Sequence, residues 1–378
     1  MIRWSVLLAR LTTLALVACG RLGFDPVLQD TTPNVPHVFA YVIDGYSAMT
    51  TKTALRIFSV NGDGALAETP SSPFELGAQA ENLRGNTAGT RLYVTSGQTT
   101  SLYTLAIDAE TGSLTLLDQH PTGALPEMIA IHPNGRWLYV PDWSAASRVD
   151  GFALDAQGIP SPIAGSPFAF PGAGADWIEI HPNGTWAYVI DNGTAMIHGM
   201  KIDAIGALSP LGTPAWPTTD SSPYAALING TGQFGFVAPD LNGGVPGFTI
   251  DSTTGALSTT PGSKFGAIAN TCMNAAMDRS RRRLFVADDG SGLNALDAYV
   301  VDAATGGLTL LAGSPYPTTT TMWSVATSPV TDDVYTTTTR VGPAIFHFRA
   351  DDTQVTKIAE YDFPGLDHAS RLALVQTP

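Results

Sequence analysis

Short apolar runs, each bounded by glycine, proline or aspartate, follow one another along the chain from about residue 37 to its end. Seven of these runs carry an aromatic residue, and consecutive aromatics lie 46 to 52 residues apart: Tyr41, Tyr93, Tyr139, Tyr188, Phe236, Phe285 and Tyr335. Runs of this length and composition are typical of β-strands. A strand-only repeat of about 50 residues predicts an all-β fold, a seven-bladed β-propeller with one blade in each repeat.

The stretch 125–168 shows the unit of the repeat most clearly. It predicts an inner strand over 128–132, a second strand over 137–140, a third over 149–154 and a short outer strand near 160. Proline, asparagine and glycine at 133–135 form a tight-turn signal between the first two strands. Each blade is therefore expected to contain four antiparallel strands, and His132 and His181 are expected to cap turns between inner and second strands.

An aspartate ends the predicted third strand in five repeats, and glycine follows in the turn. These aspartates are Asp108, Asp155, Asp203, Asp251 and Asp302. Aspartate accepts hydrogen bonds from the backbone of a turn, and glycine adopts the left-handed conformation at no steric cost. We interpret this motif as turn chemistry. The Ser-Pro-Phe triplets at 72–74 and 166–168 recur as endings of the outer strand.

The phase of the repeat at the two ends predicts how the ring closes. The run 37–43 has the character of a second strand and lacks an inner strand before it. The run 370–375 has the character of an inner strand and lacks a second strand after it. We expect the two runs to pair in one blade, which removes free sheet edges from the ring.

The first 36 residues are typical of an export signal followed by a tether. Arg3 and Arg10 form a short basic region, an apolar stretch too short to span a bilayer follows over 11–17, and the run 16–19 reads Leu-Val-Ala-Cys. This run resembles the bacterial lipobox, which implies a signal peptide over 1–18, a lipidated Cys19 and a flexible tether over 19–36. The propeller is then expected over 37–378. The lipobox resemblance implies a lipoprotein anchored at the outer membrane or cell surface, with no other contact to the membrane. An ordinary secretory signal with an incidental cysteine is the alternative.

The net charge and the cysteine content exclude two features, a nucleic-acid partner and an intramolecular disulfide. The formal net charge of −14 at pH 7 argues against nucleic acid as a partner. After processing, Cys272 is the one cysteine not committed to lipid, so no intramolecular disulfide can form. The basic cluster 279–283, broken by Ser280, is expected to mark a solvated turn between strands.

The strand motifs resemble those of lactonase-type seven-bladed propellers, the family that includes 6-phosphogluconolactonases. The run 132–136 reads His-Pro-Asn-Gly-Arg, the run 138–142 reads Leu-Tyr-Val-Pro-Asp, and Gly-Ser-Pro-Phe ends the outer strand. The resemblance implies lactone hydrolysis at the mouth where inner strands begin and second strands end, by His, Arg and Glu side chains. Asp142 and Arg148 match this pattern. With Glu127, which stands where the family has a histidine, they are the candidate catalytic residues.

Most of the other family positions carry different side chains here. The Arg and His of the fourth blade are replaced by Asp176 and its neighbour Trp177, and Asp191 precedes Asn192 where the family has an Asn-Glu pair. Two sets of acids are expected at this mouth instead, because inner strands start and second strands end on the same face. The first set is Glu81, Glu127 and Asp176, and the second is Asp44, Asp142, Asp191 and Asp288.

Crowded carboxylates either acquire raised pKa values or hold a cation. Oxygen-rich sites suit Ca²⁺ or Mg²⁺, and the candidate metal ligands are Glu127, Asp142, Asp176 and Asp191. The candidate ligand-binding residues are Glu81, Glu127, Asp142, Asp176, Asp191, Asp288 and Trp323. Alternatively, the acids are solvated or pair with Arg84, Arg148 and backbone amides. Trp143, Trp177 and Trp323 either stack on a ring-shaped ligand or pack in the interior.

Two functions therefore follow from the sequence. The first is a surface-anchored binding or interaction module whose acidic mouth takes a cation, a small polar or cationic ligand, or another protein. The second is a lactone or ester hydrolase that uses a bound divalent cation in place of the missing His and Arg.

Overall fold

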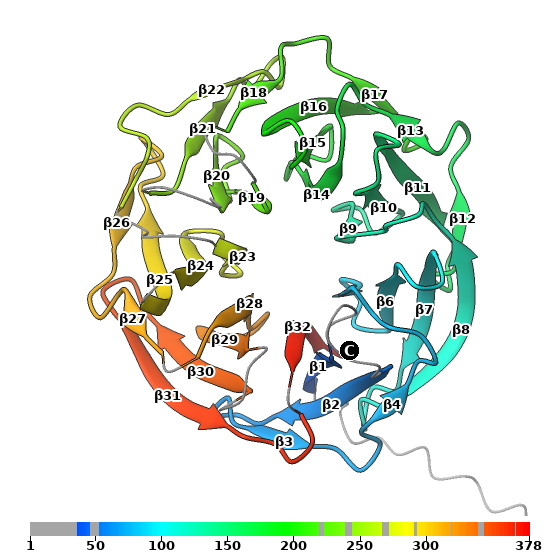
Figure 1. Cartoon of the computed structure of the whole chain (residues 1–378), viewed down its shortest axis with the longest axis vertical. Coiled ribbons are helices and arrows are strands. Elements are labelled where there is room, and N and C mark those ends of the chain that lie inside the picture. The colour runs from blue at the N-terminus through cyan, green and yellow to red at the C-terminus, as the bar shows by residue number, and fades with distance from the viewer. Residues whose placement is uncertain are drawn as a thin grey trace, which may run out of the picture. The chain divides into compact units, whose positions relative to one another are not determined.

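The computed structural model describes residues 36–45, 53–218, 223–238, 244–266, 272–290, 293–318, 320–338, 344–366 and 368–378. These residues belong to one compact unit, Pro36–Pro378, which is a ring of seven antiparallel sheets (Figure 1). The predicted seven-bladed propeller is confirmed. No helix in these ranges has the length and apolarity needed to cross a membrane. The predicted signal peptide, Cys19 and nearly all of the tether lie outside the described residues.

Each blade runs outward from an inner strand at the channel (Figure 1). The inner strands are β32 (Ala369–Gln376), β5 (Asn82–Gly85), β9 (Ala130–Ile131), β14 (Ala175–Ile180), β19 (Ala225–Ile228), β23 (Cys272–Met277) and β28 (Met322–Thr327). The second strands are β1 (Val38–Asp44), β6 (Arg91–Ser96), β10 (Trp137–Asp142), β15 (Trp186–Asp191), β20 (Phe234–Ala238), β24 (Arg283–Gly290) and β29 (Asp333–Thr338).

The third strands are β2 (Ala54–Val60), β7 (Ser101–Ile107), β11 (Arg148–Leu154), β16 (Met196–Ile202), β21 (Gly247–Ile250), β25 (Leu293–Val301) and β30 (Ile345–Ala350). The outer strands are β3 (Leu66–Glu68), β8 (Leu114–Pro121), β12 (Pro160–Pro162), β17 (Leu208–Pro210), β22 (Leu257–Thr259), β26 (Leu308–Leu310) and β31 (Val355–Tyr361). Four short strands also pair with third strands: β4 (Phe74–Glu75), β13 (Phe168–Ala169), β18 (Trp216–Pro217) and β27 (Tyr316–Pro317).

The two ends of the propeller close the ring as predicted. Strand β32 pairs antiparallel with β1, with Tyr41 opposite Ala373, so the first blade combines the two ends of the unit. The Thr377 amide also donates to the His37 carbonyl at 2.8 Å. In Figure 1 the red β32 lies beside the dark blue β1. The inner edge of this sheet is therefore built from the last strand of the chain.

The recurrent turn residues have the structural roles expected of them. Each third-strand aspartate accepts a hydrogen bond from the amide two residues further along, as in the 2.8 Å contact from Gln157 to Asp155. The serine of the Ser-Pro-Phe ending accepts from a third-strand amide; Ser166 Oγ lies 2.8 Å from the Gly151 nitrogen. His132 likewise accepts from the Asn134 amide, so it caps its own turn.

The five tyrosines among the aromatics that mark the repeat each join their blade to the next one. Their hydroxyls donate to the carbonyl of the glycine in the turn between third and outer strands of the following blade. Five such bonds, of 2.6 to 3.0 Å, connect Tyr41 to Gly112, Tyr93 to Gly158, Tyr139 to Gly206, Tyr188 to Gly255, and Tyr335 to Gly64. The last of these joins the seventh blade to the first, so the bond also closes the ring.

The glycine is required at these turns for two reasons. Gly206 has a φ of +88°, a backbone conformation that residues with a Cβ adopt only with strain. A Cβ on Gly206 would also lie 2.8 Å from the indole of Trp137 in the preceding blade, and one on Gly255 would lie 3.0 Å from Trp186. The glycine that follows the third-strand aspartate therefore has a second role, because it lets adjacent blades approach closely.

We expect Tyr139→Phe to lower the free energy of unfolding by about 1–2 kcal/mol, because the Gly206 carbonyl loses its donor while the packed ring remains. Urea denaturation followed by circular dichroism measures the loss. Tyr316→Phe, at a half-buried ring outside this set of bonds, is the matched control. A Tyr139→Phe variant as stable as the parent would contradict the role given to the hydroxyl.

We expect a chain ending at Pro364 to lose its cooperative unfolding transition, because removal of β32 leaves β1 as an exposed edge and opens the ring. Differential scanning calorimetry measures this. A single sharp transition of undiminished enthalpy in the truncated chain would show that closure by β32 is dispensable.

Candidate functional site

The inner strands are irregular where they begin, and these irregularities lie at one mouth of the channel. The pairing register with the second strand shifts at Asp176, Met273 and Trp323, each of which is an extra residue in its strand. A fourth shift, in the pairing of β1 with β32, lies beside Arg371. Such β-bulges re-aim the side chains they carry. These bulges occupy the positions that the repeat aligns with Glu81 and Glu127.

Glu81, Glu127 and Asp176 come from three consecutive blades and influence one another electrostatically. Burial, and then the charge of Asp176, raises the pKa of Glu127 well above its ordinary value, while Arg371 opposes the shift. Glu81 and Asp142 raise the pKa of Glu127 further. Burial also raises the pKa of Asp176 to about 7, opposed by Arg371 and by a hydrogen bond with Asn192. One guanidinium therefore faces several carboxyl groups.

Asp142 and Arg148 lie together at the end of the third blade's second strand. Arg148 Nε donates to Asp142 at 3.0 Å, and the amides of Leu125 and Ser144 donate at 3.1 and 3.0 Å. Burial alone raises the pKa of Asp142, but hydrogen bonds from Ser144 and Leu125 and the charge of Arg148 hold it below its ordinary value. Asp142 is thus an ionised anchor for the loops on both sides of it.

Asp191 has the same position in the fourth blade, and its carboxylate also holds loops. It accepts from the Ala173 amide at 3.0 Å, from Thr194, and from His198 Nε2 at 3.3 Å. In the first blade Arg56 lies 3.5 Å from Asp44. The second set of predicted acids is therefore largely paired within its own blades, as the alternative interpretation expected.

Asp288 differs, because a second acid lies diagonally across the sheet from it. Its direct partner in the third strand is Ala295, and Asp297 lies two residues further along. The pKa of Asp297 is raised to about 7 by burial and then by the charge of Asp288. Both side chains are buried. They sit inside the sixth blade beside Cys272, which pairs with Asp288 in the sheet.

The candidate metal ligands are divided between these environments. Glu127 and Asp176 share one electrostatic environment, whereas Asp142 and Asp191 are each enclosed by their own loops. Across the described ranges, no three His, Cys, Asp or Glu side chains come together in a group that could hold a metal ion. The arrangement favours a ligand that carries its own hydrogen-bonding groups.

The three tryptophans predicted near the mouth differ in how far they are exposed. Trp177 is buried, whereas the Trp143 side chain is 50% exposed and lies against Gly174, two residues before Asp176. The expectation that Trp143 packs in the interior is therefore wrong, because its residue follows the strand end and projects from the loop. Trp323 is half-buried, and its carbonyl accepts from Arg371 at 3.5 Å.

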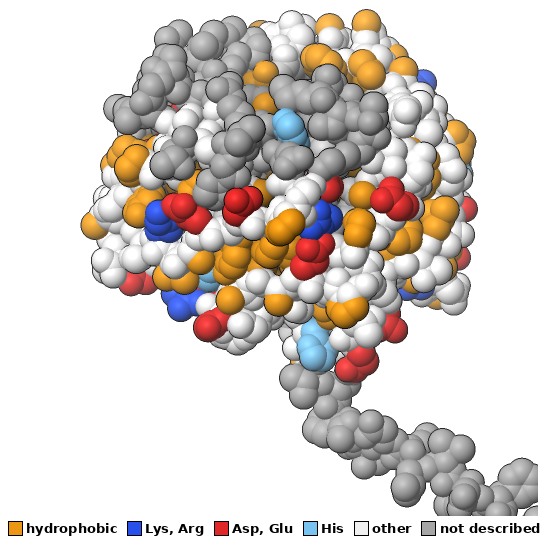
Figure 2. All heavy atoms as spheres, turned by 60° about the horizontal axis from the view of Figure 1, so that its bottom comes forward, with side chains coloured by type: hydrophobic (Ala, Val, Ile, Leu, Met, Phe, Trp, Pro, Cys, Tyr) orange, Lys and Arg blue, Asp and Glu red, His pale blue; other side chains and the backbone are white. Residues whose placement is uncertain are grey.

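The sequence interpretation missed Arg371 and Asn192 as members of this site. Arg371 lies in the closing strand, which belongs to the same set of inner strands as Glu81 and Asp176. Aligning that run with the others places Ser370 at the position of Glu81, Glu127 and Asp176, and Arg371 directly after it. On the face drawn in Figure 2, acidic and basic side chains are scattered among neutral ones.

Comparisons with known proteins agree with this architecture. Residues 42–166 match the family described as lactonase, 7-bladed beta-propeller, and no curated protein sequence matches the chain. A candidate 6-phosphogluconolactonase from Bacteroides fragilis superposes with a TM-score of 0.74 at 20% identity, over 93% of this chain and 100% of that one. The periplasmic gluconolactonase of Pseudomonas aeruginosa has a TM-score of 0.69 at 18% identity, over 90% of this chain and 100% of that one. The predicted resemblance to lactonase-type propellers is confirmed.

We expect the free energy of unfolding to fall between about pH 4 and pH 7, partly because of Asp176. Its carboxyl has an ordinary pKa of 3.8 and a folded pKa of about 7, so the folded protein binds this proton more tightly than the unfolded chain. Asp176→Asn should therefore gain on the order of 1–3 kcal/mol over the parent at pH 8 and little at pH 4.

Urea denaturation across this pH range tests the difference, with Asp362→Asn, at an exposed acid, as the control. If the free energy of unfolding depends on pH in the same way in the parent and in Asp176→Asn, the pKa of Asp176 is not raised by folding.

Proposed function

We propose that this lactonase-like propeller is a binding protein that takes a small, positively charged polar ligand at the mouth formed by Glu81, Glu127 and Asp176. The observation that carries the proposal is the raised pKa of Glu127 and Asp176 around one guanidinium, Arg371. A cation that approaches these carboxyls stabilises their ionised forms and recovers the energy that burial and repulsion cost them.

The rim of the mouth supports a ligand with an organic cation rather than a bare metal ion. The exposed indole of Trp143 lies beside the loop that leads to Asp176. An aromatic face attracts an organic cation through its quadrupole, and it also covers an apolar part of a ligand. Carboxylates below and an aromatic ring at the rim are complementary to such a molecule.

One observation favours a second candidate, a lactone or ester hydrolase. Two carboxyls with raised pKa values lie within the electrostatic reach of Arg371. A carboxyl with a pKa near 7 suits general acid–base chemistry, and a guanidinium can stabilise a developing oxyanion. In this form of the hydrolase, Arg371 takes the role that the sequence interpretation gave to a divalent cation.

The lipobox-like run 16–19 supports an exported protein anchored at the outer membrane or cell surface. The ligand would then come from outside the cytoplasm, or be presented there by another protein.

Isothermal titration with choline tests the binding function, because the charge of choline does not change with pH. We expect saturable binding at pH 8 that weakens at least tenfold at pH 5, where the carboxyls are protonated. The double variant Glu127→Gln/Asp176→Asn should abolish binding, whereas Glu110→Gln should leave it unchanged. Glucose serves as the neutral ligand.

The same preparations separate the hydrolase. Hydrolysis of gluconolactone or aliphatic lactones would favour the second candidate under three conditions. The activity should persist in the presence of chelator, and Arg371→Gln should abolish it. Its rate should also rise with pH as a group with a pKa near 7 loses its proton. Choline binding that is indifferent to pH and to the double variant would rule out the proposed site.

A further inference from the structure

A second concave site occupies the channel on the side away from the acidic mouth. It has a volume of about 670 Å³, and all seven inner strands contribute to its wall. Its far end is bounded by turns between inner and second strands, including Pro133, Pro182 and Pro329. Glu127 and Asp176 do not line it. This cavity is large enough for a small organic ligand.

Arg84 is a charged residue at a position of the inner strands that is mostly apolar. On each inner strand, the residue opposite the second-strand aromatic lines the cavity. These seven residues are Arg84, Ala130, Glu179, Leu227, Ala276, Ala326 and Ala373. Five of the seven are alanine or leucine, so this position is mainly apolar. Arg84 introduces a charge at that position from the second blade.

Arg84 has no hydrogen bond or ion pair with any residue that the structure describes. Its side chain is exposed to the open space of the cavity, and the surrounding channel wall lowers its pKa from the ordinary value. Glu179 opposes that shift, whereas Arg281 adds to it. The five donors of Arg84 remain available to a ligand.

Arg281 reaches the same cavity from the sixth blade, but its donors are partly used. Its Nη1 donates to Glu179 Oε1 at 2.7 Å and to the Ile228 carbonyl at 2.6 Å. Arg279, which is exposed, lines the cavity from the same turn. Two carboxylates, Glu179 and Asp278, also line the cavity, and Asp278 is paired with Arg283. Arg84, Arg279 and Arg281 therefore leave an excess of positive charge at this end.

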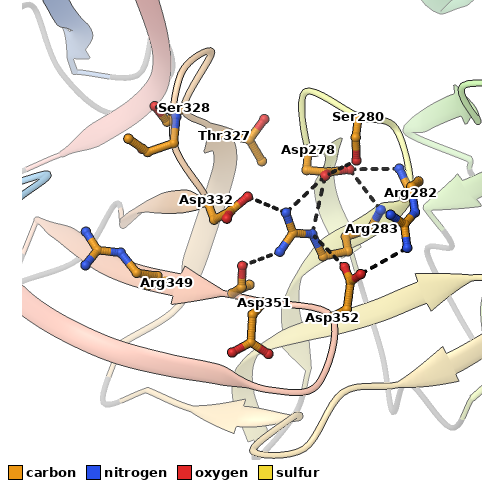
Figure 3. A network of polar contacts seen from close by, with 12 residues as sticks. Asp278, Ser280, Arg282, Arg283, Thr327, Ser328, Asp332, Arg349, Asp351 and Asp352 are labelled. Atoms are coloured by element: carbon orange, nitrogen blue, oxygen red, sulfur yellow. Dashed lines mark hydrogen bonds and ion pairs between the residues drawn. The ribbon is translucent and has the colours of Figure 1, made fainter.

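The turn that carries Arg279 and Arg281 is fixed by a polar network (Figure 3). Asp278 accepts from the amides of Arg282 and Arg283 at 2.8 and 2.9 Å, and Arg283 Nη2 lies 3.2 Å from its other oxygen. Arg283 also contacts Asp332 and the carbonyl of Ala350.

The expectation that 279–283 is a solvated turn is therefore wrong in part. Arg283 is buried at the centre of this network. The carboxylate of Asp278 pairs with Arg283 and is therefore not available to a ligand in the cavity. The turn is held in one conformation, with Arg281 at a φ of +53°.

We propose that this cavity binds a small oxyanion, a carboxylate or phosphate group of a soluble molecule, with Arg84 as its principal contact. A guanidinium recognises either group through two parallel hydrogen bonds. An excess of positive charge inside low-dielectric walls concentrates anions there, in a chain whose net charge of −14 otherwise repels them. The inference does not depend on the function proposed for the acidic mouth.

Isothermal titration with inorganic phosphate and with citrate tests this site, with glucose as the neutral control. We expect saturable binding of at least one anion, weaker at high ionic strength. Binding of phosphate alone or of citrate alone identifies the group that the site prefers, and either result supports the proposal. Arg84→Gln should weaken binding at least tenfold without lowering the melting temperature, because Arg84 has no partner to lose.

Two variants complete the test. Glu179→Gln should tighten binding about three- to tenfold, because it removes the opposing charge and releases Arg281; misfolding would not produce this gain. Arg136→Gln, at an exposed arginine on an equivalent turn outside the cavity, should bind as the parent does. No binding of either anion by the parent, or equal binding by Arg84→Gln, would overturn the proposal.

Discussion

The hydrogen bond from a second-strand tyrosine to a glycine carbonyl of the next blade is the contact on which the ring depends. It satisfies a buried hydroxyl, and it fixes the distance between blades at the point where the glycine lets them approach. The bond from Tyr335 to Gly64 crosses the closure, where strands from both ends of the unit share one sheet. The contact recurs at five of the seven joins between blades, since the fifth and sixth blades carry Phe236 and Phe285 in place of the tyrosine.

This repeated frame leaves the channel free to vary. The inner strands carry no tyrosine of the joining set, although several of their channel-lining residues, such as Leu227 and Met277, still pack in the core. At one mouth, bulges present Asp176 and Trp323, with Glu81 and Glu127 at the aligned positions. At the other end, Arg84 and the turn with Arg279 and Arg281 make the wall basic. Arg371 lies between the two, since it lines the basic cavity and also acts on Glu127 and Asp176.

The opposite charges of the two ends have a simple physical consequence. Burial raises the pKa values of Glu127 and Asp176 at the mouth, and the charge of Asp176 raises that of Glu127 further, while Arg84 faces the cavity at the other end without a partner among the described residues. Each group would be more stable with a counter-charge beside it. A fold that retains such groups within one channel is typical of a protein whose channel binds ligands, because structural carboxylates such as Asp142 and Asp191 are matched by amides and cations within their own blades.

The sequence by itself determined the fold, the number of blades, the closure by the last strand and the structural role of the turn aspartates. These follow from local rules: a strand has a period of two, a turn needs particular residues, and a blade repeats both. It also brought Glu81, Glu127 and Asp176 to one mouth, because aligned positions of a repeat share a face. The sequence did not distinguish these three acids from Asp142 and Asp191. The carboxylates of Asp142 and Asp191 accept hydrogen bonds from loop amides, and the loops vary in length from one repeat to the next. Only the tertiary structure decided that Arg371 faces the acids of the mouth, that Arg281 pairs with Glu179, and that Arg84 has no partner among the described residues. Those contacts join blades far apart in the chain, and bulges of a single residue set their geometry.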